Sequence, residues 1–319
     1  MAAERDRHQS LAPAADGTVV TVGAFDGIHL GHRVLIDETV RRAAALDLSS
    51  VVLTFSTHPA AVLRPDSAPA LLSTPEERVE AIASLGVDRL VVLPFNQAVA
   101  DLTAREFVRS VLVGRLGIRH LVIGHDHALG RDRVGDAGEL RRLGGEFGFD
   151  VSVVGPVRNG GGAAVSSSAI RAALADGDVR TAEAMLGRRY WLTGVVVRGE
   201  GRGREIGVPT ANLSLHGDKL LPAAGIYAVR AWTGGVAAPG PGGGPYDAVL
   251  HVGPRPVFDD ARVTVEAHLL DRSVDLYGRV VRLELISRIR DVSDFDSVAD
   301  LVRAIQGDVT EAKRALADI

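Results

Sequence analysis

The pattern of apolar residues changes part-way along this 319-residue chain. Between about residues 18 and 174, short β-branched runs alternate with amphipathic stretches. This alternation predicts βαβ units and a parallel sheet covered by helices on both faces. The expected strands are Val19–Val22, Val51–Thr54, Leu90–Leu93, Leu121–Ile123 and Val151–Val154; the expected helices are Arg33–Leu46, Pro75–Leu85, Ala104–Leu116 and Glu139–Phe147.

After Tyr190 the apolar segments follow one another without helices between them, separated by Gly, Pro and Asp. That texture is typical of a closed or nearly closed β-barrel. The expected strands are Trp191–Arg198, Gly225–Trp232, Tyr246–Val252, Arg262–Leu270 and Val280–Ile286. Helical spacing over Ser297–Leu316 predicts a final helix packed on the barrel. The expected fold class is α/β: a Rossmann-like parallel-sheet domain, then a β-barrel domain with a C-terminal helix.

The border between the two domains is expected near Gly187, which gives domains 16–186 and 187–319. A length of 319 residues agrees with two domains. The stretch Ala169–Leu186 has a helical pattern and is expected to bridge them. Thr233–Pro245 is so rich in Gly and Pro that it predicts a long, mobile hairpin loop.

The composition limits the partners and the compartment. The chain has no cysteine, which excludes disulfides and thiolate metal sites. No apolar run approaches the ~18 residues that a membrane span needs, and the N-terminus has no signal-peptide core. A formal net charge of -4 argues against broad nucleic-acid binding, although a local basic pocket for phosphates is compatible with it. We therefore expect a cytoplasmic protein with neither nucleic acid nor membrane as partner.

The strongest local motif is VGAFDGIHLGH, from Val22 to His32, between an expected strand and an expected helix. An α/β fold places phosphate chemistry at such a junction. His29 and His32 lie three residues apart at the start of the helix, where imidazoles can hydrogen-bond the bridging phosphates of a nucleoside triphosphate. Three glycines permit close backbone approach: Gly23, Gly27 and Gly31. The alternative reading is a glycine turn with two incidental surface histidines.

A second motif, GRGREIGVPTANL from Gly201 to Leu213, combines a glycine-rich loop with Arg204 as a counter-charge for phosphates. Thr210 and Asn212 offer the hard oxygen atoms that Mg²⁺ prefers. A flexible surface loop is the alternative. Glu266 lies in an apolar run and is either an outward-facing strand residue or a functional carboxylate.

These motifs, with others in the same order, resemble the bacterial bifunctional riboflavin kinase/FAD synthetase family. Its members fuse an FMN adenylyltransferase of the HxGH nucleotidylyl transferase superfamily to a riboflavin kinase barrel. In the first half the resemblance covers residues 22–32 (GxFDGxHxGH), 54–63 (TFxPHPxxVL), 121–136 (GxDFxFGxxxxGD) and 165–174 (ISSTxIR). In the second half it covers residues 201–213 (GRxxGFPTAN), 221–229 (PxxGVYAV), 250–271 (NIGxRPTF and EVHLLD) and 275–297 (DLYGxxxxVxFxxxIR).

The resemblance implies two reactions that use ATP with Mg²⁺: riboflavin is phosphorylated to FMN at the barrel, and FMN is adenylylated to FAD at the parallel sheet. It implies catalytic roles for His29, His32, Arg171 and Glu266, with Glu266 as the general base. The implied phosphate-binding residues are Gly23, Phe25, Asp26, Gly27, Gly31, Ser166 and Ser167, and the implied FMN-side residues are His58, Gly124 and Asp126. The implied kinase-site residues are Gly203, Arg204, Gly207, Pro209, Thr210 and Asn212, of which Thr210 and Asn212 hold Mg²⁺. Taken alone, Ser166 is expected to be a helix N-cap.

The chain departs from the family pattern beside both expected pockets. His127, Ala128 and Leu129 stand in place of Phe-x-Phe, and His251 and Val257 stand in place of Asn and Thr. Two other functions therefore stay open beside the bifunctional enzyme. One is a paralogue that acts on a modified flavin or another phosphorylated alcohol, or that has one active domain. The other is a flavin-binding or regulatory protein without turnover.

Overall fold

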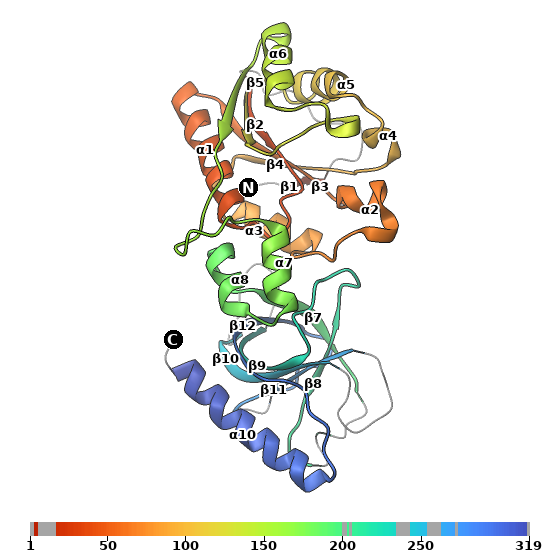
Figure 1. The fold of residues 1–319 in the computed structure, drawn as a ribbon, viewed down its shortest axis with the longest axis vertical. Coiled ribbons are helices and arrows are strands. Elements are labelled where there is room, and N and C mark those ends of the chain that lie inside the picture. The colour runs from red at the N-terminus through yellow and green to blue at the C-terminus, as the bar shows by residue number, and fades with distance from the viewer. Residues whose placement is uncertain are drawn as a thin grey trace. The chain divides into compact units, whose positions relative to one another are not determined.

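The computed structural model describes residues 3–5, 17–199, 203, 206–233, 243–253, 263–271 and 274–317. The chain divides into two compact units, Met1–Val165 and Ser166–Ile319 (Figure 1). Helices α7 (Ser167–Ala175) and α8 (Val179–Leu186) group with the barrel in the second unit. The expected domain border near Gly187 stays a prediction, and the two compact units meet between Val165 and Ser166.

The first unit is built on a parallel sheet of six strands in the order β1-β4-β3-β2-β5-β6. The strands are β1 (Ala3–Arg5), β2 (Thr18–Val22), β3 (Ser49–Phe55), β4 (Arg89–Leu93), β5 (Ile118–Gly124) and β6 (Asp150–Val154). The five expected strands are confirmed, each longer than predicted, and β1 was not expected. Every residue of β2 is buried, as in a parallel strand with helices on both faces.

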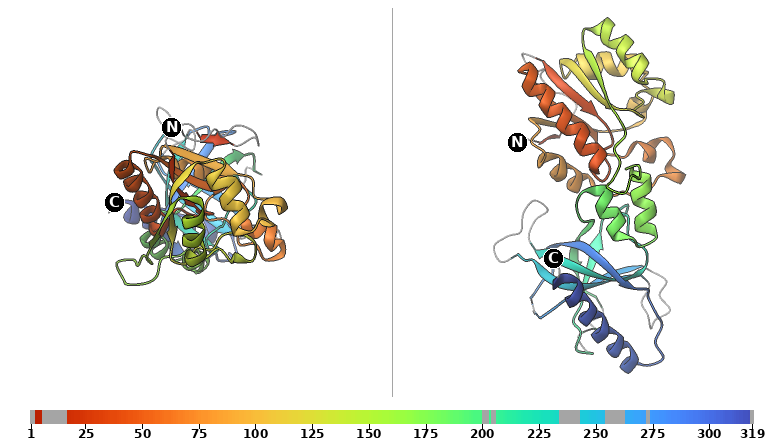
Figure 2. Two further views of the ribbon diagram at one scale, coloured as in Figure 1. Left: turned by 90° about the horizontal axis from the view of Figure 1, so that it is seen from above. Right: turned by 60° about the vertical axis from the view of Figure 1, so that its left-hand side comes forward.

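Helices cover both faces of this sheet (Figure 2). α1 (Leu30–Leu46) and α3 (Pro75–Ala83) contribute apolar side chains to the core on one face. α5 (Ala104–Phe107), η2 (Val108–Val113) and α6 (Ala137–Phe147) do so on the other. The helix expected over Ala104–Leu116 is therefore a short α-helix that continues as a π-helix. The short elements are α2 (Pro59–Leu63), η1 (Pro65–Ser67), α4 (Gln97–Ala100) and η3 (Arg131–Arg133).

The second unit is a closed antiparallel barrel in the order β10-β11-β8-β7-β12-β9. Its strands are β7 (Trp191–Val197), β8 (Ala211–Leu215), β9 (Gly225–Thr233), β10 (Tyr246–Gly253), β11 (Thr264–Leu269) and β12 (Val280–Arg290). The barrel is confirmed, but β8, which begins within the second motif, was not expected as a strand. The stretch Ala169–Leu186 is two helices, because the chain turns at Gly177 (φ 75°) and Asp178 caps α8. Residues 234–242, most of the expected hairpin loop, lie outside the described residues.

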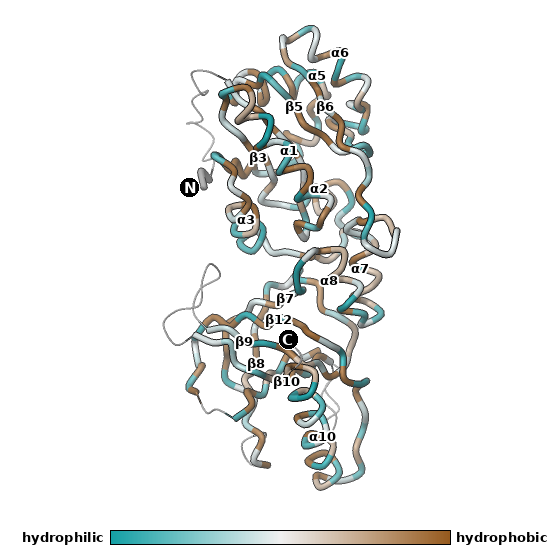
Figure 3. The backbone as a smooth tube through the Cα atoms, turned by 90° about the vertical axis from the view of Figure 1, so that its left-hand side faces the viewer, coloured by the Kyte–Doolittle hydropathy of each residue, from teal (hydrophilic) through white to brown (hydrophobic). Residues whose placement is uncertain are grey.

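The C-terminal helix α10 (Val298–Ala317) lies against the outside of the barrel. Its tube alternates between apolar and hydrophilic segments (Figure 3), and Ala312 and Leu316 pack against apolar residues of the strands. On the same helix, Asp308 accepts two hydrogen bonds of 2.7 Å from Arg290 at the end of β12. Asp308 is buried and Arg290 is partly exposed, so this pair links helix and barrel with its carboxylate shielded from solvent. In the described part of the chain, none of the helices has the length and apolarity of a membrane span.

The pair between Arg290 and the buried Asp308 predicts a measurable loss of stability when the carboxylate is removed. Asp308→Ala leaves the guanidinium without its carboxylate. Because Arg290 is partly exposed and water can reach it, the unfolding free energy of the barrel unit should fall by about 1–3 kcal/mol. Urea unfolding followed by tryptophan fluorescence measures this, because the only two tryptophans, Trp191 and Trp232, lie in the barrel strands.

Glu311→Ala is the matched control, because Glu311 forms an exposed pair with Arg314 on the same helix. Its loss should change the unfolding free energy by less than about 1 kcal/mol. Equal losses of unfolding free energy from the two substitutions would show that burial of Asp308 does not increase the contribution of its ion pair to stability.

Candidate active sites

The loop after β2 holds two residues in an unfavourable backbone conformation. Phe25 has φ 49° and Ile28 has φ 43°, in the left-handed region that non-glycine residues rarely adopt. Such residues cost on the order of 1–3 kcal/mol each and persist only where their surroundings fix them. Both side chains are buried in the core between the sheet and α1. Gly27, between them, has φ 86°, and it adopts a positive φ with less strain because it has no Cβ.

Asp26 anchors this loop from one side. Its carboxylate accepts hydrogen bonds from the backbone N–H groups of Leu72 (3.0 Å) and Ser73 (2.9 Å) and from the Ser73 hydroxyl (3.2 Å). The Ser73 hydroxyl in turn accepts from the Gly27 N–H at 3.0 Å. Asp26 is 2% exposed. Its side chain therefore supports the loop from inside the protein.

Arg78 anchors the loop from another side. This residue of α3 is fully buried, and its Nη1 donates to the carbonyl oxygen of Ala24 at 2.7 Å. The Thr54 hydroxyl donates to the same oxygen at 3.2 Å. No sequence pattern pointed to Arg78. It follows a capping box formed by Thr74 and Glu77, where an arginine ordinarily faces solvent.

The two expected histidines form a stacked pair at the start of α1. Their ring centroids lie 3.6 Å apart with the planes at 15°. His29 is the N-cap, and its Nδ1 accepts from the backbone N–H of His32 at 3.3 Å. The Phe25 ring meets His32 edge-on at 5.2 Å. A Cβ at Gly31 would lie 3.1 Å from the His29 ring, so glycine there lets the imidazole lie over the helix terminus.

Burial keeps both imidazoles neutral at pH 7. It lowers the pKa of His29 to about 4, opposed by the charges of Asp26 and Asp126. Burial, then His29 and Arg78, lower the pKa of His32 well below its ordinary value. Because Nδ1 of His29 accepts a hydrogen bond, its proton is assigned to Nε2, which is thus a donor. Nδ1 of His32 is buried and has no partner among the described residues.

The expected FMN-side residues lie at the same edge of the sheet as this pair. β3 and β5 flank β2 in parallel, so the loops that follow these strands leave the sheet together. His58 caps α2 after β3, with its Nδ1 accepting from the Ala60 N–H at 3.2 Å. Gly124 ends β5, and Asp126 in the following loop is close enough to influence His29.

His127, which replaces an aromatic residue of the family pattern, belongs to the loop after β5. Burial lowers the pKa of its imidazole to about 4. Its Nε2 is buried and has no hydrogen-bond partner in the described structure. The loop thus holds a neutral polar ring in a place where the resemblance implies a stacking aromatic ring.

The three expected site residues of the ISSTxIR resemblance belong to the second unit. Ser166 is the N-cap of α7, and its hydroxyl accepts from the Ala169 N–H at 3.2 Å, which confirms the N-cap prediction. Ser167 and Arg171 lie on α7 itself and make further interactions within the protein. Their role toward phosphate stays a prediction.

The expected kinase residues meet on the outer face of the barrel. Glu266 of β11 pairs directly with Asn212 of β8 on one side and with His251 of β10 on the other. The Thr210 hydroxyl donates to Oε2 of Glu266 at 3.2 Å. On β11 the residues on either side of Glu266 are buried, while Glu266 is partly exposed. The row from His251 through Glu266 to Asn212 is therefore a polar strip that solvent can reach.

The chain on either side of this strip is held by short contacts. His268 hydrogen-bonds the carbonyl oxygen of Pro209 at 2.8 Å, and the Val208 N–H donates to the carbonyl oxygen of Gly203 at 2.7 Å. A Cβ at Gly203 would lie 2.4 Å from the Val208 oxygen, and Gly207 has φ 77°, so this turn needs both glycines. Arg204 and Val257, named in the sequence analysis, lie outside the described residues.

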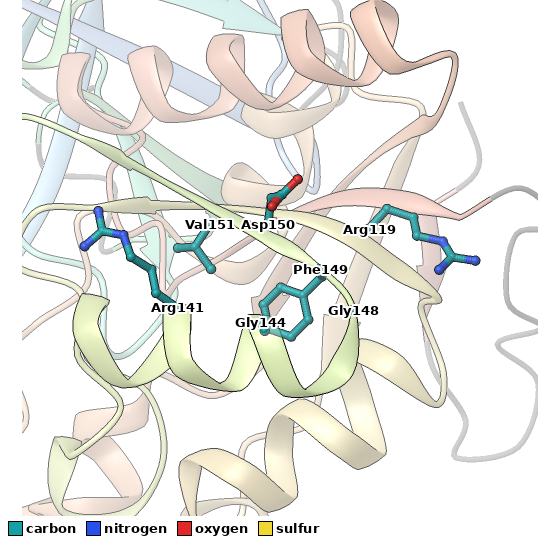
Figure 4. A pocket seen from close by; sticks show the side chains of 8 residues that line it. Arg119, Arg141, Gly144, Gly148, Phe149, Asp150 and Val151 are labelled. Atoms are coloured by element: carbon teal, nitrogen blue, oxygen red, sulfur yellow. The ribbon is translucent and has the colours of Figure 1, made fainter.

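A surface hollow of about 490 Å³ lies elsewhere, where α6 ends and β6 begins. It is lined by Arg119, Arg141, Gly144, Gly145, Gly148, Phe149, Asp150 and Val151 (Figure 4). The side chains of Arg119 and Arg141 lie at opposite sides of it and point apart. Arg119 and Asp150 belong to the beginnings of β5 and β6, so the hollow is at the opposite sheet edge from the histidine pair.

Comparisons with known proteins cover both halves of the chain. The FAD synthetase family model matches residues 11–169, and the riboflavin kinase model matches residues 186–316. Proteins named bifunctional riboflavin kinase/FMN adenylyltransferase are 35% identical in Escherichia coli (97% of this chain, 96% of the relative) and 38% identical in Pseudomonas fluorescens (97% and 96%). The relative of the same name in Bacillus subtilis is 34% identical (98% and 96%).

A crystal structure from Streptococcus pneumoniae that bears the name macrolide-efflux protein superposes with a TM-score of 0.81. It is 33% identical and covers 95% of each chain, so the two-part architecture is shared over the full length. With its two matching family models and its full-length relatives, this chain belongs to the bifunctional riboflavin kinase/FMN adenylyltransferase family.

Proposed function

We propose that this chain makes FAD from riboflavin in two steps, one at each of its candidate sites. At the barrel, riboflavin and ATP give FMN and ADP. At the parallel sheet, FMN and a second ATP give FAD and pyrophosphate. The observation that carries the proposal is the stacked pair of neutral imidazoles at the N-terminus of α1, at the edge of the sheet where nucleotides bind in such folds.

In the adenylyl transfer, a phosphate oxygen of FMN forms a bond to the α-phosphorus of ATP, and the bond from that phosphorus to the β-phosphate oxygen breaks. Negative charge grows on the departing pyrophosphate. The Nε2–H of His29 and the backbone N–H groups at the start of α1 are donors suited to that charge. A neutral imidazole donates without surrendering its proton, so this step needs no acid from His29.

In the kinase reaction, the ribityl 5'-hydroxyl loses its proton to Glu266 while its oxygen attacks the γ-phosphorus, and ADP leaves. The Thr210 hydroxyl orients the Glu266 carboxylate. The hydroxyl of Thr210 and the amide oxygen of Asn212 are hard donors that fit Mg²⁺ carried by ATP. When bound, the ion would neutralise phosphate charge.

We assign the adenylyl transfer to residues 16–186 and the kinase to residues 187–319. By this assignment Ser166, Ser167 and Arg171 serve the triphosphate of the first reaction, as the resemblance implies. The substrates are riboflavin, FMN and ATP, and the proposed compartment is the cytoplasm.

A second candidate keeps the two reactions and changes the flavin. The buried Nε2 of His127 has no partner among the described residues, and a modified flavin with an added polar group would offer one. Competition between riboflavin and such an analogue in the same assay would separate the two substrates by their kcat/KM ratio.

The two-site assignment predicts that one substitution at each site stops one reaction only. His29→Asn keeps an N-cap acceptor but removes the imidazole, and should lower FAD formation from FMN by about 10²–10³-fold. Glu266→Gln keeps an acceptor for Thr210 but removes the base, and should lower FMN formation from riboflavin by about 10²–10⁴-fold.

Chromatography of FMN and FAD after incubation with MgATP measures both reactions. Each variant is the control for the other, since His29→Asn should keep its kinase rate and Glu266→Gln its rate with added FMN. Loss of both reactions from either substitution would contradict two separate sites.

The depressed pKa of His29 predicts how the free protein titrates. Its imidazole proton resonance should shift with a midpoint of about pH 4, because burial disfavours the charged ring. NMR of the ligand-free protein is the suitable measurement, since the FMN phosphate itself titrates near pH 6 and would obscure a rate profile.

The resonance is assigned by its absence in His29→Asn, and a histidine peptide titrating near pH 6.5 is the comparison. The unfolded chain takes up this proton near pH 6.5 and the folded chain near pH 4, so the first unit should lose stability as the pH falls between these values. A midpoint near 6.5 in the folded protein would refute the neutral, buried His29.

A further inference from the structure

We propose that Arg78 is a positioning residue of the adenylyl-transfer site, which holds the loop after β2 in the strained conformation that seats the histidine pair. The inference rests on the proposed function of that loop. It concerns a residue of α3 that lies outside the two motifs around which the site was built.

The burial of Arg78 is the first observation. Its side chain is 1% exposed and heads the largest fully buried side chains of the described structure. Within the described residues no carboxylate comes within ion-pair distance of its guanidinium, while Asp26 and Glu76 act on it from farther away. A buried charge without a close counter-ion is costly, and a similar volume of apolar atoms would pack at lower cost. We therefore infer that the charge and the hydrogen-bond donors of Arg78 have a role besides packing.

The target of its hydrogen bond is the second observation. Nη1 donates to the carbonyl oxygen of Ala24, the residue directly before Phe25 with its φ of 49°. The Thr54 hydroxyl donates to the same oxygen. Two donors on one carbonyl fix the peptide plane between Ala24 and Phe25. That plane sets the backbone direction in which the strained residue must continue.

The path from this peptide to the histidines is short. The Phe25 ring, placed by that backbone, meets the edge of His32, and His32 stacks on His29. Asp26, the next residue, is tied to the segment Leu72–Ser73 that precedes α3. Arg78 and Asp26 thus hold the two sides of the strained residue from the same part of the chain. Without Arg78 the peptide can rotate toward a relaxed conformation and carry the Phe25 ring away from the imidazoles.

The charge of Arg78 adds to this mechanical role. It lowers the pKa of His32 beyond what burial does. The charged or titratable groups that influence the pair are Asp26 of the same loop, Asp126 of the loop after β5 and Arg78 of α3, together with each histidine on the other. Arg78 is the cation among them, so it favours the neutral donors that the transfer requires.

The test compares Arg78→Met, which keeps length and apolar bulk, with Arg78→Lys, which keeps the charge and a donor. Steady-state FAD formation from FMN and MgATP is measured on the full chain. Because loss of positioning acts on the oriented complex, kcat for Arg78→Met should fall by about 10²-fold while KM for FMN changes by less than about threefold. Arg78→Lys should recover kcat to within about tenfold of the wild type.

Two controls separate this effect from general damage. Riboflavin phosphorylation by the same sample reports on the barrel unit and should be unchanged in both variants. Arg109→Met, at an exposed arginine of the same unit, should leave FAD formation at the wild-type rate. If Arg78→Met fails to fold, Thr54→Val removes the other donor to Ala24 and should lower kcat by about 3–10-fold.

The inference is overturned if folded Arg78→Met retains the wild-type kcat, if Arg78→Lys is as impaired as Arg78→Met, or if Thr54→Val has no effect. Each of these results would leave the proposed function intact, because the wild type would still make FAD. A wild-type chain that makes no FAD from FMN would refute the proposed adenylyl transfer and this inference with it.

Discussion

The complete burial of β2 is the constraint on which the first unit depends. Apolar side chains of helices pack against both faces of this strand and fix the position of its end. The chain then turns away from the sheet at Gly23. The turn is made with Phe25 and Ile28 in left-handed conformations whose side chains return to the core. Burial of these side chains offsets the backbone strain. The apolar core therefore fixes the position of the histidine pair.

The two candidate sites obtain their rigidity in different ways. At the sheet, side chains from distant segments fix a loop, so the site depends on tertiary hydrogen bonds such as those of Asp26 and Arg78. At the barrel, the ladder itself places Glu266 beside Asn212 and His251, because residues paired across antiparallel strands lie on one face. A substitution in the second site would change a side chain and leave the backbone of the strands in place. A substitution in the first site can also let the backbone of the loop move.

Sequence patterns predicted the elements in which burial of the side chains is continuous or recurs at a regular spacing. The buried strands of the sheet and the two-sided helix α10 are of this kind, since every turn or pair of residues carries the same signal. β8 was missed because Ala211–Leu215 mixes small and polar residues, and pairing with β7 and β11 overrides its weak preference. Arg78 was missed for a related reason. Its burial follows from a contact 54 residues away along the chain, which no local pattern encodes.

Three of the buried charged residues in the described structure join one element of the fold to another. Asp26 ties a loop to the segment before α3, Arg78 ties the same loop to α3, and Asp308 with Arg290 ties α10 to the barrel. Exposed pairs along the helices, such as Arg142 with Glu139, contribute little to stability because solvent screens them. A buried charge tolerates few alternative partners, so displacement of its element leaves it unsatisfied at high cost. Directional, costly contacts of this kind give a loop or helix a single position, which apolar packing alone specifies less sharply.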